Sequence, residues 1–213
     1  MFRDNYSVAS GKASYFYNYL PAPSWGSYDE GFTPNTASFV SMAVYGDTPY
    51  VAFKDDSTGK ANLYWDNDGM RSYADSDFSD GSADYTSLAI DSSGNVFVAY
   101  SDGTVGGKVT VKTWDSFAWV DVGSKGFSAG AAAFVSLAIG ADDTLYVAYR
   151  DAANSGKATV QKFNGTSWEL VGTAGFSAGS ADYISLVVDG PIPMIAFKDG
   201  SAGGKVTVMV SPP

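Results

Sequence analysis

The feature that most constrains this chain is an internal repeat. A Gly-Lys pair recurs through its 213 residues with spacings of 48, 48, 49 and 48 between successive lysines, which are Lys12, Lys60, Lys108, Lys157 and Lys205. An aspartate ends an apolar run shortly before each pair, and these aspartates are Asp4, Asp55, Asp102, Asp151 and Asp199. A period of this length indicates that each unit is one supersecondary structure that stacks against its neighbours.

Each unit contains four strand signals, seen most clearly in the second complete unit. Residues 87–90 and 96–100 are nearly continuous apolar runs, which suit strands buried on both faces. Residues 108–114 alternate apolar and polar side chains, and residues 119–122 give a short fourth strand. Strands that become more polar from first to last predict the blade of a β-propeller, with the first strand next to the axis. A solenoid is the alternative, although its coils are usually shorter.

The units at the two ends of the chain are incomplete. Residues 31–77, 78–126 and 127–175 form complete units, whereas residues 1–30 lack the first strand signal and residues 176–213 lack the fourth. We therefore expect one all-β domain over residues 1–213, a propeller of five blades with partial units at both termini. A ring of four blades with surplus strands at each end is the alternative. Open blade edges invite pairing with another chain, so self-association is an expected interaction.

The composition of the chain excludes several kinds of catalytic site and makes several kinds of partner poor candidates. The chain contains no histidine and no cysteine, which excludes Ser-His and Cys-His nucleophiles and histidine-ligated metals. Its net charge is −10 at pH 7 and its basic residues form no run, so nucleic acid and anionic membrane surfaces are poor partners. No apolar stretch approaches the ~20 residues of a membrane-spanning helix, so we expect no membrane insertion.

Recurring tryptophans are candidates for ligand binding. Trp65 ends a third strand, Trp119 and Trp168 begin fourth strands, and Trp25 takes the corresponding place in the first unit. These rings either pack between blades, which we favour, or form stacking platforms for the C–H faces of sugars.

Recurring basic residues are the second group of candidates. Lys54, Arg150 and Lys198 each precede the recurring aspartate. Together with the lysines of the Gly-Lys pairs, they either form ion pairs that fix hairpin register, which we favour, or recognise ligand hydroxyl or carboxylate groups between blades.

Carboxylates give two further hypotheses. Asp66 and Asp68 offer hard oxygen ligands for Ca²⁺, but the EF-hand spacing and its closing glutamate are absent. We expect no cofactor, with calcium as the alternative.

Asp84 and Asp182 share a repeat position that is not acidic in the other units, so a glycoside-acting enzyme would use these residues. We expect no catalysis.

The residue pattern of the repeat resembles the patterns of known propeller families. The segment "NVFVAYSDG…GKVTVKTWDSFAWVDVG" resembles the blades of fucose-binding propeller lectins. In those blades a strand ends in Asp and is followed by a Gly-containing turn, a second strand, a Trp-Asp turn and a further Trp. This resemblance implies ligand sites between blades, built from Arg, Glu and Trp or Tyr. The segment "SLAIDSSGNVFVAYSD" is similar to NHL-type propeller repeats, which implies a ring that binds proteins, peptides or RNA. The acidity of the chain argues against RNA.

These observations together predict a non-catalytic binding module. We expect a lectin-like, carbohydrate-binding or adhesion propeller that belongs to a larger secreted or cell-surface protein and binds a glycan or a surface protein. A protein-interaction or purely structural repeat propeller is one alternative, and a glycoside-acting enzyme is another.

Overall fold

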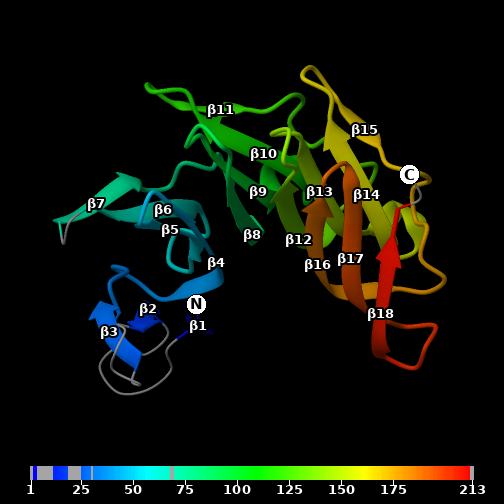
Figure 1. Ribbon diagram of the computed structural model, residues 1–213, viewed down its shortest axis with the longest axis horizontal. Coiled ribbons are helices and arrows are strands. Elements are labelled where there is room, and N and C mark those ends of the chain that lie inside the picture. Colours follow the sequence, from blue (N-terminus) through cyan, green and yellow to red (C-terminus); the bar gives the residue numbers. More distant parts are fainter. Residues whose placement is uncertain (1, 4–11, 19–24, 30, 68–69, 212–213) are drawn as a thin grey trace.

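A computed structural model describes residues 2–3, 12–18, 25–29, 31–67 and 70–211, and the side chains of residues 12, 31–65 and 76–211. The chain forms five antiparallel sheets arranged around an arc (Figure 1), which we number blades 1 to 5. The described residues contain no α-helix, only 3₁₀ turns at Gly103–Val105 and Ala152–Asn154. No described helix is long and apolar enough to cross a membrane. The prediction of an all-β propeller is confirmed.

The strands follow the repeat. Blades 1 and 2 contain β1 (Phe2–Arg3), β2 (Ala13–Asn18) and β3 (Trp25–Asp29), then β4 (Ala37–Tyr45), β5 (Thr48–Asp55), β6 (Ala61–Asn67) and β7 (Met70–Asp75). Blades 3 and 4 contain β8 (Ala83–Ile90), β9 (Val96–Asp102), β10 (Lys108–Trp114) and β11 (Trp119–Asp121), then β12 (Ala132–Ile139), β13 (Leu145–Asp151), β14 (Lys157–Phe163) and β15 (Trp168–Leu170). Blade 5 contains β16 (Ala181–Asp189), β17 (Ile192–Asp199) and β18 (Lys205–Val210).

A recurring serine joins the first strands of neighbouring blades. The Leu137 amide donates to Ser87 Oγ over 2.9 Å, and the Leu186 amide donates to Ser136 Oγ over 3.0 Å. The Leu88 amide makes the same bond to Ser41 at 2.9 Å. Because each bond links one blade to the next, the repeated serine sets the relative height of adjacent sheets.

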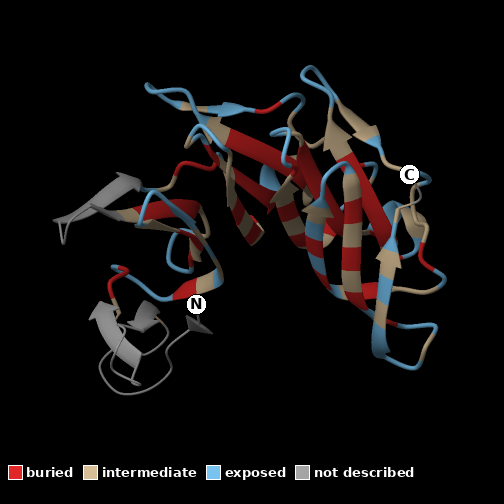
Figure 2. Ribbon diagram, in the orientation of Figure 1, coloured by how far each residue is buried: buried red, intermediate tan, exposed pale blue. Residues whose placement is uncertain are grey.

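The hydrophobic core lies between blades rather than at one centre. The faces of blades 3 and 4 meet in one buried cluster that includes Val109, Val111, Leu137 and Val147. Similar clusters join blade 2 to blade 3 and blade 4 to blade 5. Figure 2 shows these buried residues concentrated in the strands of the middle blades.

The recurring aspartate acts as a turn residue. Asp102 pairs in register with Lys108, as the hairpin pattern predicts. Its carboxylate, however, accepts hydrogen bonds from the Thr104 amide at 2.9 Å and from Thr110 Oγ1 at 3.0 Å. Among the described residues, no ion pair joins a recurring aspartate to the lysine of its Gly-Lys pair. Turn amides and a threonine hydroxyl satisfy the buried carboxylate instead.

Blade 5 has one face without a neighbouring described blade. Val206 and Val208 of β18 are 76% and 65% exposed, whereas Val109 and Val111, at the same repeat positions of β10, are 0% and 1% exposed. The same residue pattern is thus buried where a described blade packs against it and exposed where no described blade does.

Candidate functional site

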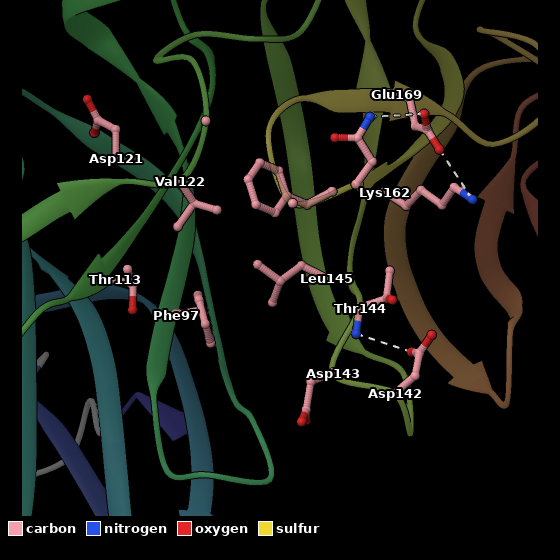
Figure 3. A pocket seen from close by; sticks show the side chains of 14 residues that line it. Phe97, Thr113, Asp121, Val122, Asp142, Asp143, Thr144, Leu145, Lys162 and Glu169 are labelled. Carbon is pink, nitrogen blue, oxygen red and sulfur yellow. Dashed lines mark hydrogen bonds and ion pairs between the residues drawn. The ribbon is translucent and has the colours of Figure 1, made fainter.

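A groove between blades 3 and 4 is the candidate site (Figure 3). Its cavity volume is about 660 Å³. β9, β10 and the end of β11 line one side, and the turn before β13, the end of β14 and the start of β15 line the other. We call this cavity the interblade groove.

Apolar side chains form the base of the interblade groove. Phe97, Val122, Leu145 and Phe163 contribute this surface. The ring of Phe163 packs against Trp168, with ring centroids 5.4 Å apart. Polar and charged side chains make up most of the remaining lining, so the groove offers a ligand both apolar contact and hydrogen-bonding groups.

Glu169 and Lys162 place opposite charges together at the upper rim. The two residues face each other in the β14–β15 pairing, and Lys162 Nζ lies 3.3 Å from Glu169 Oε1. The second carboxylate oxygen of Glu169 accepts a hydrogen bond from Asn164 Nδ2 at 3.2 Å. Ammonium, amide and carboxylate groups therefore lie within reach of one ligand, offering both donors and acceptors.

Two turn aspartates add negative charge at the lower rim. The Thr144 amide donates to Asp142 at 3.2 Å, and hydrogen bonds from the backbone and hydroxyl of Thr144 lower the pKa of Asp142 below 3.8. Asp143 accepts from the hydroxyl and the amide of Ser92 at 2.6 and 2.9 Å, and these bonds likewise lower its pKa below 3.8. Both carboxylates are therefore ionised at neutral pH and remain so into mild acid.

The charged residues of the interblade groove are not repeated at the equivalent positions of blade 3. Blade 3 carries Thr113 at the strand position of Lys162 and Val120 at that of Glu169. No other unit repeats the glutamate, since Glu30 and Glu169 are the only two in the chain. Within the described part of the chain, this combination of groups therefore belongs to a single groove.

The structure places the candidate tryptophans mainly in blade packing. Trp119 stacks on Phe78 at 4.0 Å, and Trp168 stacks on Phe127 at 4.4 Å. Trp65 is half-buried against Tyr50, at 5.8 Å between ring centroids. The side chain of Trp25, at the start of β3, lies outside the described residues.

The basic candidates join neighbouring blades. Lys54 Nζ lies 2.6 Å from Asp84, and Arg150 Nη1 lies 2.9 Å from Asp182. Lys198 is exposed, with its ammonium group 6.0 Å from the centre of the Tyr183 ring. Lys54 and Arg150 therefore form ion pairs across blade interfaces, whereas the expected ion pair between a recurring aspartate and its Gly-Lys lysine does not form among the described residues.

The two carboxylates proposed for catalysis lie apart in the structure, and the two proposed for calcium lie outside the described side chains. Asp84 and Asp182 lie at two different blade interfaces, each paired with a basic side chain. The side chain of Asp66 and the whole of Asp68 lie outside the described residues. The described residues contain no group of three or more metal-ligating side chains.

Sequence reasoning did not select Lys162, Glu169, Asp142 or Asp143. The available signal was departure from the repeat, because Glu169 is a rare glutamate in a chain whose other acidic residues, except one, are aspartates. That signal favoured Asp84 and Asp182 only because they recur in two units.

Comparison with known proteins identifies the fold but no family. No family model matches the chain, and no curated protein matches it. The structure is similar to the SapL1 lectin solved with α-methyl fucoside, with a TM-score of 0.62 and 14% identity over 88% of this chain and 65% of that one. The chain thus spans just under two thirds of that lectin.

Two further solved structures represent different activities on this fold. The Aleuria aurantia lectin, solved as a mutant with Fucα1-6GlcNAc, matches with a TM-score of 0.60 and 17% identity over 95% of this chain and 72% of that one. The Hadza microbial sialidase Hz136 matches with a TM-score of 0.56 and 12% identity over 84% of this chain and 45% of that one. At these identities the similarity establishes a propeller fold shared with fucose-binding lectins, and the function has to be argued from the site.

Proposed function

We propose that this chain is a non-catalytic, lectin-like module of a secreted or surface protein, and that it binds a neutral glycan in the interblade groove. The observation that carries the proposal is that Glu169, Lys162 and Asn164 meet in the lining of the groove that also contains Phe163. The likeness in fold to lectins solved with fucosides supports the same class of ligand.

The chemistry of the interblade groove suits a sugar. Each sugar hydroxyl both donates and accepts hydrogen bonds, and the rim supplies a carboxylate acceptor beside ammonium and amide donors. The ring of Phe163 offers an apolar face for the C–H groups of a pyranose. Hydrogen bonds to charged groups contribute about 1.5–3 kcal/mol each, so two or three of them explain selective recognition of a small ligand.

The charge of the interblade groove favours neutral over acidic sugars. Asp121, Asp142, Asp143 and Glu169 line it, against Lys162 as the lining ammonium group. Asp121 is itself paired with Lys112 at 2.9 Å, but the remaining carboxylates outnumber Lys162. A sialic acid carboxylate would be repelled here, which argues against sialidase-like use of this groove.

A glycan array with sialylated and neutral arms tests the proposal, with methyl α-fucoside as the first soluble competitor. We expect neutral glycans among the positive signals and none that depends on sialic acid. Glu169→Gln and Lys162→Met should each weaken binding tenfold or more, because each removes a charged hydrogen-bonding group.

Lys205→Met is the matched control, since Lys205 is exposed on blade 5, away from the interblade groove. It makes the same change of charge and should leave binding unaltered. An array without signals, or equal binding by the Glu169→Gln protein, would contradict the proposed function.

A further inference from the structure

The turn between β14 and β15 contains a sequence motif for N-glycosylation. Asn164-Gly165-Thr166 matches the acceptor pattern, in which an asparagine is followed two residues later by serine or threonine. Residues 164–167 are all exposed, and Figure 2 shows this turn in pale blue at the end of the hairpin. A Cβ placed on Gly165 would meet no atom within 4 Å. The motif therefore stands in open space, with room for an attached oligosaccharide.

The fold of the turn does not require this motif. Residues 115–118 of blade 3 form the same turn, in which the amide of the first residue donates to the carbonyl of the fourth at 3.1 Å, against 3.0 Å in blade 4. In both turns a side-chain oxygen of the first residue, Asp115 or Asn164, accepts from the amides of the third and fourth. Within the described part of the chain, Thr166 Oγ1 makes no hydrogen bond. An aspartate serves the turn as well as an asparagine, and the threonine hydroxyl remains available to a glycosylating enzyme.

The acceptor nitrogen of this motif lies at the rim of the interblade groove. Asn164 and Gly165 both belong to the lining of the groove. Asn164 Nδ2 lies 3.2 Å from Glu169 Oε2 and 3.3 Å from Ser167 Oγ. Lys162 Nζ lies 3.3 Å from the other carboxylate oxygen of Glu169 (Figure 3). A sugar bonded to Nδ2 would therefore begin beside the charged groups of the groove.

We propose that Asn164 is an N-glycosylation site and that its attached oligosaccharide covers the mouth of the interblade groove. The proposal rests on the proposed secretion of the chain. The co-reactant is an oligosaccharide carried on a lipid diphosphate, and a transferase of the secretory pathway joins it to the asparagine. Nδ2 forms a bond to the anomeric carbon of the first sugar while the bond from that carbon to the diphosphate oxygen breaks. The lipid diphosphate leaves with the electron pair, and a base of the transferase takes the proton from Nδ2.

Modification changes the interblade groove in two ways. The modified amide keeps one N–H, so it donates to Glu169 or to Ser167 but no longer to both. The bulky, hydrated oligosaccharide also takes the space through which another glycan would enter. The modified chain is thus a closed form and the unmodified chain an open form. The modified fraction of the protein then sets how much of it binds external glycans.

Secretion of the whole 213-residue chain from a eukaryotic host tests the modification. Thr166→Ala removes the motif but keeps Asn164, and Thr166→Ser is the matched control that keeps the motif. The modification is located by mass spectrometry of peptides, because a second motif, Asn5-Tyr6-Ser7, lies outside the described residues. We expect oligosaccharide on Asn164 of the parent and of Thr166→Ser, and none on Asn164 of Thr166→Ala. An unmodified Asn164 in the secreted parent overturns the proposal.

Acetylation of lysines measures the covering of the groove without any glycan ligand. The side chain of Lys162 is 41% exposed, and Lys205, exposed on blade 5, is the internal reference. We expect Lys162 of the modified parent to react with acetic anhydride several-fold more slowly than Lys162 of Thr166→Ala, with equal rates at Lys205. Equal rates at Lys162 in the two proteins overturn the covering of the groove.

Binding of the strongest neutral glycan from the array gives the second readout. The modified parent should bind it about tenfold more weakly than Thr166→Ala, or weaker still. Equal affinities of the two proteins overturn the proposal. If neither protein binds any glycan while Lys162 is protected, the proposed glycan-binding function fails and the glycosylation that covers the groove is supported.

Discussion

At the residue scale, Trp168 and Trp119 occupy equivalent places but differ in one interaction. The Trp168 indole donates to Val122 at 2.8 Å, whereas the indole nitrogen of Trp119 is buried without a hydrogen-bond partner in the described structure. A buried N–H that lacks a partner loses its bonds to water without replacement. The same residue type is thus stabilised by its polar atom at one interface and destabilised by it at the other.

The two tryptophans should therefore respond differently to replacement by phenylalanine. Both substitutions remove similar apolar area, so the difference between them reports the hydrogen bond. We expect Trp168→Phe to lower the free energy of unfolding by about 1–3 kcal/mol more than Trp119→Phe, because it leaves the Val122 carbonyl unpaired. Urea unfolding of the two variants measures this difference, and equal losses would show that the indole bond makes no net contribution.

At the element scale, β10 and β18 show that a strand's role depends on its neighbour. Both strands begin with the same sequence, Lys-Val-Thr-Val. The valines of β10 pack against blade 4, while those of β18 remain exposed. Strand sequence alone therefore does not determine which faces of a propeller blade are buried.

A pair of matched substitutions tests this dependence. Val111→Ala removes two methyl groups from a fully buried position and should cost roughly 1–3 kcal/mol of unfolding free energy. Val208→Ala makes the same change at an exposed position and should stay within about 0.5 kcal/mol of the parent. Denaturant unfolding measures both values. A large loss from Val208→Ala would mean that this face is covered in solution.

At the scale of the whole molecule, the repeat was enough to predict the fold. Gly-Lys pairs, the aspartates that end apolar runs and alternating strands are local signals for strands and turns. Because each signal recurs in several units, the strand assignment does not depend on any single unit. The interblade packing of Trp119 and Trp168 also followed from their recurrence, since packing against a neighbour must repeat when blades repeat.

The candidate site could not be predicted in the same way. The interblade groove depends on Lys162 and Glu169 meeting across a strand pair, and on Asp142 from a turn of the same blade lying near them. Their positions relative to one another follow from how strands and turns are arranged in space. Selecting residues because they recur at a repeat position also misses residues that occur in only one unit, and Glu169 is such a residue.

Isothermal titration calorimetry of the whole chain with the strongest neutral glycan from the array tests the central claim most directly. The account predicts one class of site per chain, because the described polar set belongs to one groove, and loss of the binding heat in Glu169→Gln. Several equivalent sites per chain, or unchanged binding heat in Glu169→Gln, would contradict the claim that the interblade groove between blades 3 and 4 binds the glycan.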